Sequence, residues 1–192
     1  MTIRALSTMI GVFCIALTTV LHAAPAPFRL DQAQSIVAFT YDLSGTRTRG
    51  TMPIKDADIA LDLNNLSASR VAVTLSPDRA KAGYIWATNA MRSGQVLDTK
   101  QFPEISFVST SIRGDLSGGT VTGNLTVRGV TRPVILSAKL YRQSGTEVTD
   151  RDRLQILLTG RIDRNSFGAS GFPGMVGPKL DLEIIARIER IR

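Results

Sequence analysis

Apolar and polar residues alternate with a period of two along most of the chain. The alternation recurs in eight segments, which cover residues 37–41, 59–63, 71–75, 105–107, 121–128, 134–141, 154–158 and 180–189. An extended chain places successive side chains on opposite faces, so each segment predicts a strand with one apolar face. Glycines in several connections are typical of turns between antiparallel strands. The pattern therefore predicts an all-β, antiparallel domain.

One stretch departs from this alternation. Ser76 followed by Pro77 is typical of a helix start, with serine as the cap and proline in the first turn. The residues up to Met91 suit a helix, which Gly83 weakens. A second short helical turn is expected over residues 93–97. We thus predict a short helical segment between the central strands.

Strands with one apolar face can form a two-sheet sandwich or close into a barrel. An eight-stranded barrel encloses either packed side chains or one small ligand. The inward positions are mostly aliphatic, which leaves room for an apolar cavity. Strand parity assigns to the interior Val37, Phe39, Val71, Val73, Ile105, Phe107, Val121, Leu125, Leu136, Leu158, Ile184 and Ala186.

The first 23 residues are typical of a cleavable signal peptide. Arg4 precedes an apolar run over residues 5–20, and small residues at Ala23 and Ala24 suit cleavage. The run is shorter than the roughly 20 residues that span a bilayer, so a retained anchor is the weaker alternative. Residues 24–192 then form one secreted domain.

Composition argues against an enzyme. The only histidine, His22, and the only cysteine, Cys14, both lie in the predicted signal peptide. The remaining chain lacks the usual neutral-pH base, a thiolate nucleophile and the common transition-metal ligands. We predict no catalytic residues, no metal and no cofactor. The chain carries a net charge of +7, but its basic residues are dispersed, which predicts no nucleic-acid binding. A solvated surface or loose attraction to anionic membranes explains the charge.

Several blocks of sequence resemble the YceI-like family, and they come in the family's order. The matching residues are Asp31, Ser35, Val37 and Phe39; 91–93 with 97–98; 102–107; 123–134; and Arg164, Phe167 and Gly168. The resemblance implies a lipocalin-like, eight-stranded barrel in the bacterial periplasm. It also implies an elongated apolar cavity that holds a polyisoprenoid chain, such as the tail of an isoprenoid quinone.

The chain departs from the family pattern where that pattern has histidines. Gln34 replaces the first, Leu43 lies near the second, and Ala90 replaces the one in the middle block. The head-group partners that these histidines suggest are missing here, whereas a site for an apolar tail is preserved.

The mouth of such a cavity would lie near the helix and a glycine-rich loop over residues 168–178. We assign to this mouth or gate Trp86, Met91, Phe102, Phe167 and Phe172. The apolar tips of the loop are compatible with transient membrane contact, a partner or a homodimer. The rival hypothesis is a solidly packed barrel without a ligand, which acts as a structural or interaction protein through its surface loops.

Overall fold

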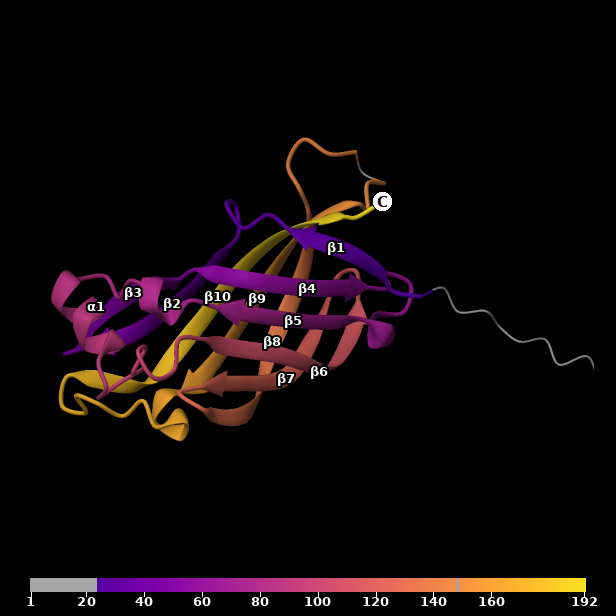
Figure 1. Ribbon diagram of the computed structural model, residues 1–192. Coiled ribbons are helices and arrows are strands. Elements are labelled where there is room, and N and C mark those ends of the chain that lie inside the picture. The colour runs from indigo at the N-terminus through magenta and orange to yellow at the C-terminus, as the bar shows by residue number, and fades with distance from the viewer. Residues whose placement is uncertain (1–23, 148) are drawn as a thin grey trace, which may run out of the picture.

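The computed structural model describes residues 24–147 and 149–192, most of them in strands (Figure 1). The predicted signal peptide lies outside the described residues. The strands are β1 (Ala26–Leu30), β2 (Ile36–Leu43), β3 (Thr46–Met52), β4 (Ile54–Leu61), β5 (Arg70–Leu75), β6 (Ile105–Asp115), β7 (Gly118–Val127), β8 (Val130–Arg142), β9 (Arg153–Asp163) and β10 (Val176–Arg190).

These ten strand segments fill eight positions in a closed antiparallel barrel. β1 and β2 pair with successive parts of β10, through Leu30 opposite Ile188 and Ile36 opposite Ile185. β3 pairs with β2, and β4 pairs with β1. Each of these two positions is therefore one long strand with a break, at residues 31–35 and at Pro53. Pro53 has no N–H to donate to a ladder. The predicted eight-stranded barrel is confirmed.

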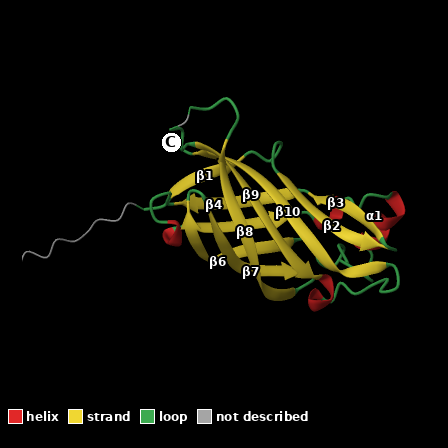
Figure 2. Cartoon of the chain, turned by 180° about the vertical axis from the view of Figure 1, so that it is seen from behind, coloured by secondary structure: helices red, strands yellow, loops and turns green. Residues whose placement is uncertain are grey.

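The ring closes because the first and last strands pair with each other. The order is β1-β4-β5-β6-β7-β8-β9-β10, and β10 returns to β1. Seen from behind, β8, β9 and β10 cross the barrel obliquely, as closure of a twisted sheet requires (Figure 2). In the closed ring, alternate residues of each strand still point to opposite faces of the sheet. The apolar faces of the strands therefore line one common interior.

The helical segment is present but begins later than predicted. A 3₁₀ turn, η2 (Pro77–Arg79), follows Ser76, and the helix α1 covers Ile85–Arg92. Gly83 separates the two with a φ of +84°, a backbone conformation that ends a right-handed helix. Residues 93–97 form turns rather than a helix. Two further 3₁₀ turns are η1 (Leu66–Ala68) and η3 (Arg164–Phe167).

One end of the barrel is covered, and we call it the cap end. It is formed by α1, the residues up to 104, the β2–β3 turn and the loop over residues 168–175 (Figure 1). Backbone hydrogen bonds join these parts: Gly171 N donates to Gln95 O (3.0 Å), and Ser44 N donates to Met175 O (2.8 Å). The largest group of buried side chains lies beneath this cover. Among the described residues, no helix is long and apolar enough to cross a membrane.

Candidate functional site

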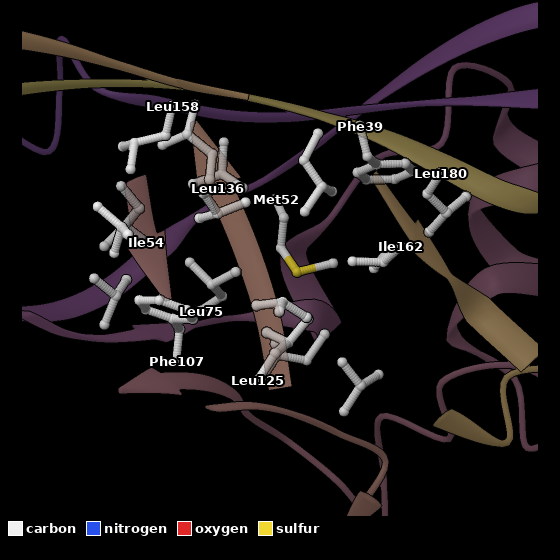
Figure 3. Close-up of a pocket in the computed structure, with 18 of the residues that line it drawn as sticks. Phe39, Met52, Ile54, Leu75, Phe107, Leu125, Leu136, Leu158, Ile162 and Leu180 are labelled. Carbon is white, nitrogen blue, oxygen red and sulfur yellow. The ribbon is translucent and has the colours of Figure 1, made fainter. Parts of the chain in front are cut away.

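The barrel encloses an apolar cavity of about 430 Å³, a volume within the range of small-molecule sites. It reaches from the cap end, at Ala87 and Leu97, to Leu63 and Leu66 near η1. Figure 3 shows the central part, where the labelled side chains converge from several strands and carry no nitrogen or oxygen. The Met52 sulfur is their only heteroatom. Such a wall offers contacts to hydrocarbon and to little else.

Every interior residue assigned by strand parity lines this cavity. The twelve are Val37, Phe39, Val71, Val73, Ile105, Phe107, Val121, Leu125, Leu136, Leu158, Ile184 and Ala186. The pairing registers explain the agreement, because lumen residues face lumen residues across neighbouring strands, as in Val121 opposite Leu136 and Leu158 opposite Ile184. Their part in holding a ligand stays a prediction.

The middle of the barrel is hollow rather than packed solid. Inward residues at the cap end, such as Phe39 and Leu125, are buried. Val73, Phe107 and Ile184 also point inward, yet they are only partly buried. A side chain that faces the interior keeps accessible surface only where space adjoins it. This difference argues against the solidly packed barrel of the rival hypothesis.

Glycines next to the rings of Phe39 and Phe107 give the cavity its width. Gly50 lies directly across from Phe39, and a Cβ on it would collide with that ring. Gly123 is paired with Ser109, two residues along β6 from Phe107, and a Cβ on it would collide with the Phe107 ring and come within 2.6 Å of Val108 O. Each ring therefore lies flat against the wall over a glycine, instead of extending across the lumen.

In the part of the chain that the structure describes, the cavity lining at the cap end holds almost no polar groups that could bind a ligand. Leu43 and Ala90, which stand near or at the family's histidine positions, both line the cavity. Tyr41 Oη donates to Ala82 O at 2.7 Å. Burial, and to a lesser extent Tyr84, raises the pKa of the Tyr41 phenol. Its hydroxyl is thus neutral and already committed to holding the backbone that precedes α1.

Among the residues that the structure describes, Arg164 is the one buried cation of this end, and its donors are committed as well. It is 5% exposed, and burial lowers the pKa of its guanidinium. Nε donates to Gly177 O (3.0 Å), Nη2 to Val176 O (2.8 Å), and Nη1 to both Ala169 O and Gly171 O. Arg164 belongs to the cavity lining, but its donors are used to fasten the loop over residues 168–175.

Four of the five predicted mouth residues line the cavity, namely Trp86, Met91, Phe167 and Phe172. Phe167 is buried, whereas Trp86 and Phe172 are exposed. The structure corrects the fifth, because Phe102 is outside the cavity lining. Its ring covers the β7–β8 turn instead, where a Cβ on Gly129 would lie 2.9 Å from it.

Sequence reasoning missed several lining residues. β3 was not predicted, because its inward positions are Thr48, Gly50 and Met52 and do not form an aliphatic stripe. Its outward arginines, Arg47 and Arg49, were the available signal of alternation. The wall also includes six further residues of the predicted strands, beyond the twelve assigned to the interior: Leu75, Val134, Leu140, Ile156, Leu180 and Leu182.

At the barrel end opposite the cap end, the cavity lining includes more polar residues. Arg113, Asp115 and Thr120 belong to the lining there and are exposed. Hydrogen bonds from the Ser117 side chain and from the backbone of Ser117 and Gly118 lower the pKa of Asp115. Within residues 24–147 and 149–192, no three histidine, cysteine, aspartate or glutamate side chains gather as metal ligands would.

A model of the YceI-like domain matches residues 28–188. The chain belongs to the YceI-like family. Protein YceI of Salmonella newport is 30% identical over 165 residues, which cover 84% of this chain and 86% of the relative. A UPF0312 protein of Enterobacter sp. strain 638 is 31% identical over 135 residues, or 70% of each chain. The resemblance seen in the sequence blocks is confirmed.

Solved structures share the barrel of this YceI-like chain at low sequence identity. BcnA of Burkholderia cenocepacia has a TM-score of 0.73 at 17% identity, over 83% of this chain and 99% of its own. A polyisoprenoid binding domain from Saccharophagus degradans has a TM-score of 0.63 at 10% identity, over 86% of this chain and 99% of its own. At these identities, the likeness concerns the fold.

Proposed function

We propose that this chain is a non-enzymatic periplasmic carrier that holds the tail of a polyisoprenoid lipid, such as an isoprenoid quinone, inside its barrel. The observation that carries the proposal is the lumen itself, which is hollow, apolar and continuous from the cap end to the η1 end. A polyisoprenoid tail is a long hydrocarbon of matching chemistry. The solved polyisoprenoid binding domain of the same fold supports this class of ligand.

Desolvation supplies the affinity in this proposal. Each methylene group moved from water into the lumen contributes about 0.8 kcal/mol, so a few isoprene units suffice without a polar contact. Lumen-facing residues on β10 run from Leu180 to Ile188, a span of roughly 26 Å along the strand. Cavity length and width, rather than the head group, would then select the ligand.

Secretion and membrane contact belong to the same proposal. The N-terminal segment, which lies outside the described residues, would direct the chain to the periplasm. There the carrier would meet membranes that contain its ligand, and transient contact with them follows from its task. A homodimer stays a prediction.

The proposal is tested by native mass spectrometry of the processed protein, followed by organic extraction and identification of the lipid. We expect a stoichiometric adduct whose extracted lipid has a tail built from isoprene units. A mass that stays that of the bare protein, even after incubation with quinones and polyprenyl lipids, would overturn the proposal.

Two adjacent leucines on β9 provide matched variants for this experiment. Leu158 lines the lumen, whereas Leu157 lies on the outer wall opposite Ile185. Leu158→Gln places an amide in the lumen without a partner and should strip the adduct. Leu157→Gln should keep it. Equal lipid occupancy in the two folded variants would show that the lipid binds somewhere other than the lumen.

A further inference from the structure

Large apolar side chains are exposed together at the cap end. Ile85 is 84% exposed, and its neighbours Tyr84 and Trp86 are each 52% exposed. Phe172 and Met175 are exposed on the loop over residues 168–175. We call these five residues the apolar rim. An isolated exposed apolar residue is ordinary, but a group of them at one end of a domain marks an interaction surface.

The fold holds the rim in place. The rings of Tyr84 and Trp86 stack with centroids 6.0 Å apart and planes 12° apart. Phe172 has a φ of +56°, which is unfavourable for a bulky side chain. Arg164 fixes the loop that carries Phe172 through four backbone carbonyls. The rim is thus built to stay exposed, at a cost in backbone energy.

The rim is continuous with the lipid cavity. Trp86, Phe172 and Met175 line the cavity and are also exposed at the surface. They come from two different elements, α1 and the loop over residues 168–175, and both elements contribute to the lining of this part of the cavity. A hydrocarbon tail that passes between these elements would touch apolar side chains from the outer surface to the lumen.

The residue types of the rim fit the interface of a bilayer. Trp and Tyr concentrate where hydrocarbon meets head groups, because each has an apolar ring and a polar tip. From Arg79 to Lys100 the chain carries four basic residues and one acidic residue. Among the described residues, Arg79, Lys81 and Lys100 form no ion pair. Unpaired cations beside an apolar surface favour anionic lipids.

We infer that the apolar rim docks on anionic lipid bilayers and that lipid tails enter and leave the cavity between α1 and the loop over residues 168–175. The inference rests on the proposed carrier function, which it deepens by naming the docking surface and the way in. A tail that follows this path is never exposed to water during transfer.

The test uses vesicles of phosphatidylethanolamine and phosphatidylglycerol, with phosphatidylcholine vesicles for comparison. Trp86 is the only tryptophan of the chain, so its fluorescence reports on the rim alone. On the anionic vesicles we expect a blue shift and quenching by lipids that carry a spin label in the acyl chain. Weaker binding is expected on phosphatidylcholine and at high salt. Fluorescence that vesicles of either kind leave unchanged would overturn the inference.

Two isoleucines give a matched pair of variants. Ile85→Glu alters the apolar rim at the first residue of α1. A carboxylate at the N-terminus of a helix interacts favourably with the helix dipole, so the fold should be preserved. Ile135→Glu makes the same change on the outer wall of β8, at 65% exposure. Vesicle affinity should fall at least about tenfold in the first, the effect of losing one large buried aliphatic side chain. The second should match the wild type, and equal losses in both would overturn the inference.

Lipid occupancy separates this inference from the carrier function. Ile85 is not part of the cavity lining, so Ile85→Glu should keep its lipid adduct while losing vesicle binding. If the wild-type protein carries lipid but does not bind vesicles, the proposed docking surface is refuted and the carrier function still stands. A blue shift that grows with protein concentration in the absence of vesicles would instead assign the rim to a second copy of the chain.

Discussion

The two parts of the barrel interior are built from the same strands yet differ in packing. At the cap end, Phe39, Leu43 and Val127 are buried against the covering segments. In the middle, Val73, Phe107 and Ile184 line the cavity and are only partly buried. Both parts obey the same alternation of apolar and polar residues. The difference arises from what covers each part, because strand parity decides only which way a side chain points.

The cover is held by polar groups, whereas the hollow part is maintained by small residues. Arg164 and Tyr41 fasten the covering segments through backbone carbonyls. In the hollow part, Gly123 keeps the Phe107 ring against the wall, as Gly50 does for Phe39 at the cap end. A closed end therefore depends on a few buried hydrogen bonds, and an open middle depends on missing side chains. The hydrogen bonds and the glycines can be removed separately by substitution.

The largest effect is expected from Arg164→Met, which leaves four carbonyls at the cap end without their donor. Buried carbonyls that lose a charged partner are costly, so unfolding free energy should fall by about 3–5 kcal/mol. Chemical denaturation measures it. Arg161→Met is the matched control, because Arg161 forms an exposed ion pair with Asp181 and should lose less than about 1 kcal/mol. Similar losses in both variants would refute the fastening role of Arg164.

Gly123→Ala should damage the hollow part. The new methyl group meets the Phe107 ring and, at 2.6 Å, Val108 O. Crowding of this kind costs about 1–3 kcal/mol of unfolding free energy, and the displaced ring should lower lipid occupancy. Denaturation and native mass spectrometry measure the two effects.

A second substitution separates the ring from the backbone. In a Phe107→Leu background, Gly123→Ala should no longer reduce lipid occupancy, while the stability loss from the Val108 contact remains. If occupancy still falls in that background, the ring is not what sets the width of the cavity.

Tyr41→Phe removes the hydrogen bond to Ala82 O and should cost about 1 kcal/mol at neutral pH. Burial raises the pKa of Tyr41 in the folded protein. The unfolded chain therefore loses this proton first as pH rises, and folding loses stability above the ordinary phenol pKa of about 10. Denaturation curves of wild type and variant should converge above that pH. A difference in unfolding free energy that stays constant above this pH would contradict the raised pKa of Tyr41 in the folded protein.

The strands that sequence could predict are those whose inward residues are large and aliphatic. β7 and β8 alternate without interruption, so their parity placed Val121 and Leu136 correctly in the wall. β3 could not be found in this way, because Thr48 and Gly50 carry no hydrophobic signal. Gly50 is there to make room for Phe39, a requirement that only the paired strand reveals.

The cap end was the least predictable part of the site. Proline after Ser76 suggested a helix start, yet the positive φ of Gly83 delays α1 to Ile85. The resemblance of the Phe102 segment to the family pattern predicts Phe102 at the mouth, whereas its ring covers Gly129. Arg164 bonds to carbonyls, which every residue possesses, so no pattern of side chains could name its partners.

The smallest expected effect concerns Asp163, which supports the cap end from outside. Its carboxylate accepts from Lys179 Nζ (3.0 Å) and from Asn165 N (2.9 Å). The Lys179 bond is the larger cause and the Asn165 bond the second, and together they lower the pKa of Asp163. Because the pKa of Asp163 is lowered in the folded state, its carboxylate contributes fully to stability above the ordinary carboxyl range, and this contribution disappears as pH falls through the folded-state pKa.

Asp163→Asn should therefore be slightly less stable than wild type at pH 7, and the difference in unfolding free energy should vanish in acid. Denaturation at both pH values measures this, and about 1 M salt should shrink the neutral-pH difference because the pair is exposed. If the difference in unfolding free energy instead stays constant across the acid range, the ion pair with Lys179 does not contribute. Asp163 then acts only by accepting the hydrogen bond from Asn165 N, which asparagine can also accept.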